Sequence, residues 1–200
     1  MTVPRASTPL LSSLHQARAA LDALLADGAG MAAAERAPDV IAACLKVGGK
    51  VLAVGNGGSC CDAAHFCEEL TGRFRNDRPP LAAIACSDAS HITCTANDYG
   101  FEHIFSRWVQ GLGRKGDVLV ALSTSGNSPN IVRAVAAAKH AGMTTIALLG
   151  RDGGKLRGAC DLDIIVPGDG SDRIQELHML LLHGWVEQIE RLMFPELIGR

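Results

Sequence analysis

Short apolar runs that stop abruptly at small polar turns constrain the fold of this chain more than any other feature of its sequence. The run at residues 50–54 ends at Gly55-Asn56-Gly57-Gly58, which predicts a strand followed by a tight turn. Four further runs of this kind precede polar or glycine-rich turns, at residues 81–86, 117–122, 144–149 and 162–166. Such continuous runs indicate strands that are buried on both faces of a sheet.

Helical stretches separate most of these runs. Neighbouring parallel strands need a crossover connection, and a crossover helix also supplies the layer that covers the sheet. The sequence therefore predicts an α/β fold of three layers, flavodoxin-like, with a five-stranded parallel sheet flanked by helices.

Helices are also expected at both ends of the chain. Apolar residues recur at helical spacing over 10–25, behind Thr8 as a cap and Pro9 in the first turn. A second helical stretch over about 32–47 ends at two glycines, and a long one covers 172–192. The last helix is apolar on more than one stripe, which favours an intersubunit helical bundle over a helix that is sandwiched inside its own domain.

Chain length and composition limit the number of domains. Two hundred residues, of which 48% are hydrophobic and 20% charged, suffice for one well-buried domain and are too few for two ordinary ones. We expect a single domain over 1–200. In it, an N-terminal helical segment at about 8–47 precedes a sheet core at about 48–170 and a C-terminal helix at about 172–193.

Charge and cysteine usage indicate a cytoplasmic protein. A net charge of -2 offers no excess of Lys and Arg for nucleic acid or an anionic membrane. The N-terminus lacks a signal-peptide pattern, and no apolar run approaches the roughly 20 residues that span a bilayer. The seven cysteines are an odd number without a C-x-x-C pair, so we expect free thiols and no disulfide framework.

Two turns at strand ends are suited to an anion, because ligands of open parallel sheets bind beyond the carboxyl ends of the strands. The turn at 55–59 leads into a helix and can present several backbone N–H groups. It lacks a P-loop ending and the full G-x-G-x-x-G spacing, which disfavours a nucleotide. Taken alone, it is explained equally well as a turn that needs glycine only for its backbone geometry.

The second turn, Ser123-Thr124-Ser125-Gly126-Asn127-Ser128, follows the run at 117–122 and precedes Pro129, which suits the first turn of a helix. Hydroxyl donors, backbone N–H groups and the positive end of a helix dipole together hold a phosphate monoester without Lys or Arg. Serine-rich turns are also common as plain caps. At the end of a parallel strand this one favours phosphate.

Four further side chains offer metal ligands. His65 and Glu69 are four residues apart on one helix face, and Gln175 and His183 lie eight residues apart on the last helix. Together they supply nitrogen and oxygen ligands for a tetrahedral zinc ion. Taken singly, each is better explained by packing, capping or solvation than by metal binding. Because eight helical residues span roughly 12 Å, we expect the pocket to combine elements from more than one subunit.

In order and spacing, these residues resemble the phosphoheptose isomerases of the SIS superfamily. The resemblance covers about 40–192 and rests on Gly55-Asn56-Gly57-Gly58-Ser59, His65-Phe66, Glu68-Glu69-Leu70-Thr71-Gly72-Arg73, Asn97-Asp98, Ser123-Thr124-Ser125-Gly126-Asn127-Ser128, Arg173-Ile174-Gln175-Glu176 and His183. It implies a SIS domain, a homotetramer with active sites near the subunit interfaces, and conversion of D-sedoheptulose 7-phosphate to D-glycero-D-manno-heptose 7-phosphate. That reaction begins ADP/GDP-heptose precursor synthesis for lipopolysaccharide core or capsule.

The resemblance also implies the roles of individual residues. One zinc ion per subunit would be bound by His65, Glu69, Gln175 and His183. Substrate would be contacted by Asn56, Gly57, Gly58, Ser59, Glu69, Asn97, Asp98, Ser123, Thr124, Ser125, Ser128 and Gln175. Moving a proton between C1 and C2 through an enediol needs an acid/base pair, for which Glu69 and His183 are the candidates. Alternatively zinc orients the sugar, and another residue or a water moves the proton.

Two other functional classes fit part of the pattern. A related SIS protein that binds the bacterial replication initiator shares the R-I-Q-E segment and a Phe-Pro pair, here Phe194-Pro195. It resembles a family member that has lost its acid/base residues. A regulatory sugar-phosphate sensor would keep the turn at 123–128 without turnover. This sequence retains Glu69 and His183, which favours the enzyme.

Overall fold

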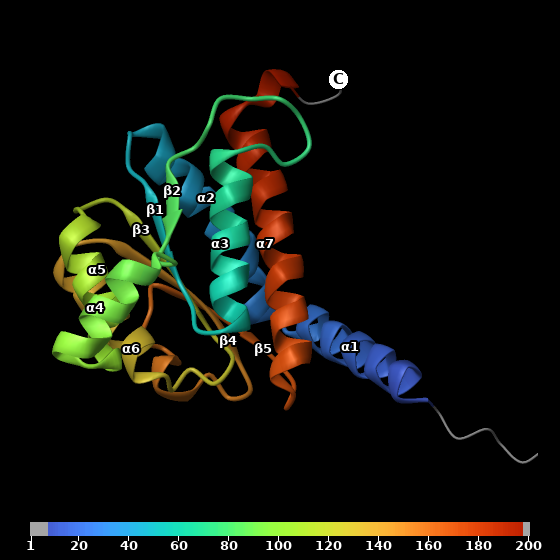
Figure 1. Ribbon diagram of the computed structural model, residues 1–200. Coiled ribbons are helices and arrows are strands. Elements are labelled where there is room, and N and C mark those ends of the chain that lie inside the picture. The colour runs from blue at the N-terminus through green and yellow to red at the C-terminus, as the bar shows by residue number, and fades with distance from the viewer. Residues whose placement is uncertain (1–7, 198–200) are drawn as a thin grey trace, which may run out of the picture.

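A five-stranded parallel sheet in the order β2-β1-β3-β4-β5 forms the centre of the computed structural model, which describes residues 8–197 (Figure 1). The strands are β1 (Val51–Val54), β2 (Ala83–Ala85), β3 (Val118–Ser123), β4 (Thr144–Gly150) and β5 (Leu162–Val166). Every neighbouring pair is parallel. The predicted α/β fold and its five parallel strands are confirmed.

Helices cover both faces of the sheet. One layer holds α1 (Pro9–Ala26), α2 (Gly28–Lys46), α3 (Gly58–Thr71) and α7 (Ser171–Met193). The other layer holds α4 (Ala89–Tyr99), α5 (Ile104–Leu112) and α6 (Pro129–His140). The chain also forms short 3₁₀ helices, η1 (Phe101–His103), η2 (Gly154–Leu156) and η3 (Pro195–Leu197). Within residues 8–197, no helix is both long and apolar enough to cross a membrane.

The strands bury alternate side chains in two separate cores. Val51 and Ala53 of β1 pack towards α3 and α7, whereas Leu52 and Val54 pack towards α5 and α6. β1, β3 and β4 are buried on both faces, as predicted from their continuous apolar runs. The same prediction was wrong for β2 and β5, because both strands lie at an edge of the sheet: Ile84 of β2 is 45% exposed, and buried residues alternate with half-buried ones along β5.

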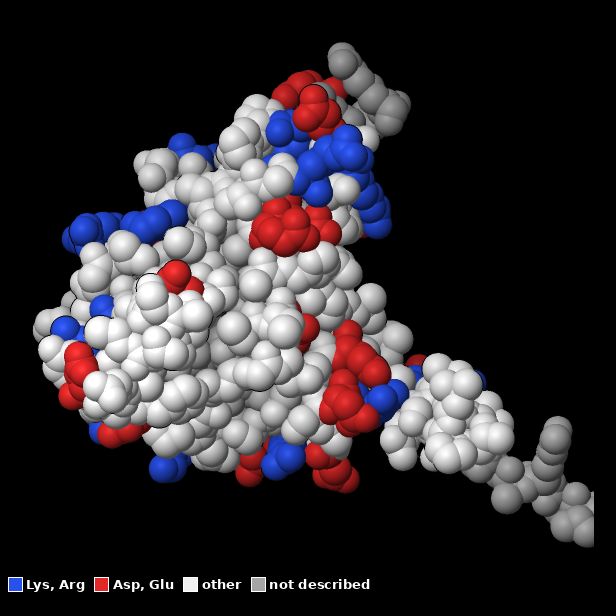
Figure 2. Space-filling view, in the orientation of Figure 1, with Lys and Arg blue, Asp and Glu red and all other residues white. Residues whose placement is uncertain are grey.

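The N-terminal helix projects from the body of the molecule (Figure 1). Its predicted cap is confirmed, since the Leu11 N–H donates to Thr8 Oγ1 at 3.3 Å. Leu10 and Leu14 are 70% and 58% exposed, and the projection is largely uncharged on the side seen in Figure 2. Within the chain, Arg173 ties α1 to the start of α7 by donating to the Ser13 carbonyl at 3.2 Å.

All seven cysteines are free thiols, as predicted. Cys44, Cys67 and Cys86 are buried, where thiols behave as small apolar groups. Burial raises the pKa of Cys67 to about 12, and burial with the nearby Cys60 and Asp88 raises that of Cys86 to about 12 as well. These two thiols stay protonated and therefore have little reactivity.

The turn after β3 requires glycine at its centre. Gly126 has a φ of +62°, and a Cβ atom there would lie 1.9 Å from the Gly153 carbonyl oxygen. The Leu156 N–H donates to the Gly126 carbonyl, and the Lys155 N–H donates to Asn127 Oδ1. The turn is therefore packed directly on the loop that follows β4.

A buried histidine fixes α7 to the sheet. His178 is fully buried, and its Nε2 lies 2.8 Å from the Leu149 carbonyl oxygen near the end of β4. A carbonyl oxygen only accepts, so Nε2 must carry a proton and donate it to this contact. The neutral imidazole, with its one N–H at Nε2, can therefore make the bond. Burial lowers the pKa of His178 to about 4.

The lowered pKa of His178 predicts a loss of stability in mild acid. Between about pH 6.5 and about pH 4, the unfolded chain binds a proton at His178 that the folded chain does not bind, so the free energy of unfolding falls as the pH falls. We expect His178 to contribute a loss of about 2 kcal/mol between pH 7 and pH 5. Urea unfolding at both pH values measures it. We expect this loss of unfolding free energy to disappear in His178→Gln and to persist in His15→Gln, which replaces an exposed histidine. Equal losses in the wild type and both variants would contradict the assignment to His178.

The crowding at Gly126 predicts an unusually large effect of alanine. Gly48 also has a positive φ, of +82°, but a Cβ atom there meets nothing within 4 Å. Gly48→Ala therefore loses about 1 to 2 kcal/mol of unfolding free energy from backbone conformation alone. Gly126→Ala loses a further ~1 to 3 kcal/mol, since the turn must also move away from Gly153. Urea unfolding compares the two variants, and equal losses would show that the contact is relieved without cost.

Candidate active site

Two histidines and a carboxylate converge between α3 and α7. Ligand atoms of His65, Glu69 and His183 all lie within 4.8 Å of one another. The Nε2 atoms of the two imidazoles are 3.1 Å apart, and His65 Nε2 lies 3.5 Å from Glu69 Oε1. His65 and Glu69 share one face of α3 as their spacing predicts, and α7 brings His183 to them from 118 residues along the chain.

The neighbours of these three side chains orient the rings. His65 Nδ1 lies 2.9 Å from Glu68 Oε1, so that nitrogen carries the proton and Nε2 offers its lone pair to the cluster. The Phe74 ring stacks on His183, with centroids 5.7 Å apart and planes inclined by 23°. Neither contact follows from the sequence interpretation, although the i, i+3 spacing of His65 and Glu68 is a signal for the first.

The cluster fits a divalent cation. Two imidazole nitrogens and one carboxylate oxygen form a set of three ligands that zinc accepts, with a fourth position left for water or substrate. All three residues are half-buried, so the cluster is reachable from solvent. Gln175, the fourth predicted ligand, makes no hydrogen bond with these three side chains among residues 8–197.

Gln175 lies instead against the turn after β1. Its Nε2 donates to Ser59 Oγ at 3.4 Å, and a Cβ atom at Gly58 would lie 2.5 Å from Gln175 Oε1. Gln175 is therefore packed directly on Gly58, so a side chain at this position would displace the Gln175 amide.

An unpaired carboxylate lies beside Gln175. Asp62, Asp172, Gln175, Glu176 and Met179 line a cavity of about 490 Å³ between α3 and α7. Asp62 Oδ2 is buried without a hydrogen-bond partner among residues 8–197, and burial raises the pKa of this carboxyl, against a smaller lowering by His65. The oxygen is free to accept a hydrogen bond from a hydroxyl group in the cavity.

The serine-rich turn lies between β3 and α6, as predicted. Ser123 Oγ accepts from the Gly126 N–H at 3.1 Å and lies 3.5 Å from Ser128 Oγ, while Thr124 Oγ1 donates to Ser171 Oγ at 3.3 Å. The last bond joins the turn to the first residue of α7. Ser128 precedes Pro129 in the first turn of α6, so hydroxyls and the helix N-terminus face the same region.

A pair of amides joins the two turns. Asn56 Nδ2 donates to Asn130 Oδ1 at 2.9 Å, and Asn130 Nδ2 donates to Asn56 Oδ1 at 2.8 Å. Asn130 is buried in the first turn of α6 and was missed by the sequence interpretation, which has no signal for a contact across 74 residues. Asn56, Gly57, Gly58 and Ser59 are therefore held in a fixed relation to Ser123, Thr124, Ser125 and Ser128.

Asn97 and Asp98 make no hydrogen bond with the two turns or with the three clustered side chains among residues 8–197. They lie near the end of α4, in the layer on the other face of the sheet (Figure 1). Both are exposed, and their side chains bond within α4: Asn97 Nδ2 donates to Asp98 Oδ1 at 2.7 Å, and Cys94 Sγ donates to Asp98 Oδ2.

Known proteins resemble this chain closely. The family model of the SIS domain matches residues 14–150. A phosphoheptose isomerase of Fusobacterium nucleatum is 60% identical over 149 residues, which cover 74% of this chain and 77% of that protein. One of Edwardsiella ictaluri is 51% identical over 183 residues, 91% of this chain and 95% of that protein.

The fold agrees with that result. The structure of a phosphoheptose isomerase from Francisella tularensis superposes with a TM-score of 0.86 at 38% identity, covering 91% of this chain and 96% of that one. Sequence identity of this extent over nearly the whole chain shows common family membership in addition to a shared fold. The chain therefore belongs to the phosphoheptose isomerase family of SIS-domain proteins.

Proposed function

We propose that this protein is a zinc-dependent isomerase in the cytoplasm that converts D-sedoheptulose 7-phosphate to D-glycero-D-manno-heptose 7-phosphate. The convergence of His65, Glu69 and His183 between α3 and α7 is the observation that carries the proposal. The relatives named phosphoheptose isomerase, at 51% and 60% identity, support it. The product would enter the synthesis of ADP- or GDP-heptose for a surface polysaccharide.

The metal site would use the atoms that already converge. His65 Nε2, His183 Nε2 and Glu69 Oε1 would bind one zinc ion per subunit, with Gln175 as a fourth ligand. Because Gln175 lies two helical turns from His183, it would have to change its side-chain conformation or come from a neighbouring subunit. Bound zinc would polarise the oxygens of the reacting carbons, in the manner of a Lewis acid.

Glu69 and His183 would carry the protons. The ketose gives up a proton from C1 to form an enediol, and a proton is then delivered to C2 while the C1 oxygen becomes the aldehyde. A carboxylate at Glu69 suits the carbon-bound proton, and the His183 imidazole suits exchange at the oxygens. A water held beside Asp62 is the alternative carrier, because a carboxylate that binds zinc is a weaker base.

The remaining predicted residues would hold the substrate. The phosphate would lie in the turn of Ser123, Thr124, Ser125 and Ser128, at the N-terminus of α6. Sugar hydroxyls would contact Asn56, Gly57, Gly58, Ser59 and Gln175. Binding the remote phosphate orients C1 and C2 at the other end of the substrate, which lowers the entropic part of the barrier.

Replacing one carboxylate tests the reaction and its site together. We expect Glu69→Gln, which keeps the size of the side chain, to lower kcat by a factor of about 10² to 10⁴. Proton NMR of D-sedoheptulose 7-phosphate with zinc-loaded protein follows the aldose signals, and the exposed Glu196→Gln is the matched control. A folded, zinc-loaded wild-type protein that forms no aldose would contradict the proposal and favour a sugar-phosphate sensor or an initiator-binding protein.

We also propose a homotetramer in which each active site combines two subunits. Asn97 and Asp98 are exposed near the end of α4 and bond only within that helix among the described residues, which leaves them accessible to a neighbouring copy. The exposed leucines of α1 give that copy an apolar surface to cover.

Mixing two inactive variants tests the shared site. If Glu69 and Asp98 of one site belong to different subunits, tetramers reassembled from equal amounts of Glu69→Gln and Asp98→Asn subunits contain intact sites and regain about a quarter of the wild-type activity. If both residues act from one chain, no site is intact and the mixture stays inactive. Light scattering of the mixture checks that tetramers have formed.

A further inference from the structure

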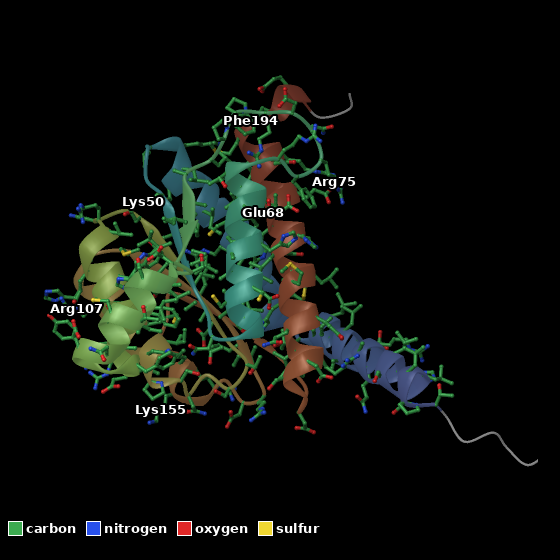
Figure 3. All side chains as sticks on the ribbon, in the orientation of Figure 1. Lys50, Glu68, Arg75, Arg107, Lys155 and Phe194 are labelled. Carbon is green, nitrogen blue, oxygen red and sulfur yellow. The ribbon has the colours of Figure 1, made fainter. Side chains whose placement is uncertain are left out.

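The loop between α3 and β2, residues 72–82, crosses to α7 (Figure 1). Three of its side chains contact residues of α7. The Phe74 ring stacks on His183, Arg75 pairs with Glu187, and Arg78 pairs with Glu190. Figure 3 labels Arg75 at this crossing, with Phe194 at the end of α7 nearby. The loop therefore connects the two helices that carry His65, Glu69 and His183.

Arg78 is the buried member of this set. Its side chain is 1% exposed and that of Glu190 is 13% exposed, and Arg78 Nε donates to Glu190 Oε1 at 2.9 Å. Arg78 Nη2 donates to the Glu69 carbonyl at 2.5 Å, and Nη1 donates to the Leu70 carbonyl at 2.7 Å. One guanidinium thus joins the backbone of α3 to a carboxylate of α7.

The position of these bonds matters for the metal cluster. The last carbonyls of a helix lack partners within the helix, and a cation there also satisfies the negative end of its dipole. Arg78 caps α3 in this way at Glu69, the residue that supplies the carboxylate of the cluster. On α7, Glu190 lies two turns beyond His183, on the same side of the helix. The planar fork of arginine holds both partners at fixed distances and angles.

We propose that Arg78 is a positioning residue for the metal site. Through the Glu69 carbonyl and Glu190, it fixes the distance and the axial register between α3 and α7, and it seats the loop that places Phe74 on His183. It touches neither substrate nor metal. The inference rests on the proposed function, because it concerns the metal cluster described there.

The same loop offers a matched control. Arg75 Nη1 lies 2.9 Å from Glu187 Oε2, so it also pairs with α7, one turn before Glu190. Its side chain is 61% exposed, and its other contact is with the Phe74 ring, at 5.2 Å. Exposed ion pairs of this kind contribute little to a fixed geometry. Removing Arg75 therefore removes a similar charge from the same loop without removing the cap of α3.

The test is the affinity of the purified protein for zinc. Wild type, Arg78→Lys, Glu190→Gln and Arg75→Gln are titrated with zinc against a competing chelator, and cobalt-loaded samples are compared by their visible absorption. Lysine keeps the charge of Arg78 but loses the fork. We expect Arg78→Lys to weaken zinc binding by a factor of about 10 to 100 and to change the cobalt spectrum, as loss of an outer partner of a metal ligand does.

Arg75→Gln is expected to bind zinc as wild type does. Circular dichroism shows which variants are folded. Glu190→Gln keeps the size of the side chain but removes the charge that pairs with the buried Arg78, so it is also expected to weaken zinc binding, and it decides the outcome if Arg78→Lys fails to fold. The inference is overturned if a folded Arg78→Lys, or Glu190→Gln in its place, retains wild-type zinc affinity and the wild-type cobalt spectrum. A wild-type protein that binds no zinc would instead overturn the proposed metal site itself.

Discussion

The packing of α3 against α7 is the contact on which the chemistry of this molecule depends. α3 follows β1 in the first part of the chain and α7 follows β5 at its end, so only the completed sheet brings them together. Phe66 and Trp185, 1% and 3% exposed, meet edge to face with centroids 6.4 Å apart and fix the apolar side of the contact. His65, Glu69 and His183 lie along the same contact, where it reaches solvent.

Much of this architecture could be predicted from local patterns. Continuous apolar runs identify β1, β3 and β4 because these strands are buried on both faces, and the turns after β1 and β3 carry glycine and hydroxyl residues because a helix begins there. The spacing of His65 and Glu69 places them on one face of α3. The meeting of both with His183 follows only from the family resemblance, since periodicity along one helix says nothing about which helix packs beside it.

The residues that escaped prediction act across long stretches of chain. Asn130 bonds to Asn56 across 74 residues, and Arg78 bonds to Glu190 across 112. Arg78 lies in a loop, where no hydrophobic periodicity distinguishes a buried arginine from an exposed one. β2 departed from the expected burial for a related reason, because its place at the edge of the sheet is a property of the assembled strands.

The reciprocal amide pair of Asn56 and Asn130 joins the turns after β1 and β3, where the strand order reverses its direction across the sheet. Neither amide titrates, and neither carries a net charge that dissolved salt could screen. An ion pair at this position would loosen with ionic strength and would repel or attract the anionic end of a ligand. A neutral link keeps the two turns aligned across a wide range of pH and ionic strength. It leaves the electrostatic field between the turns to the helix N-termini and the hydroxyl groups.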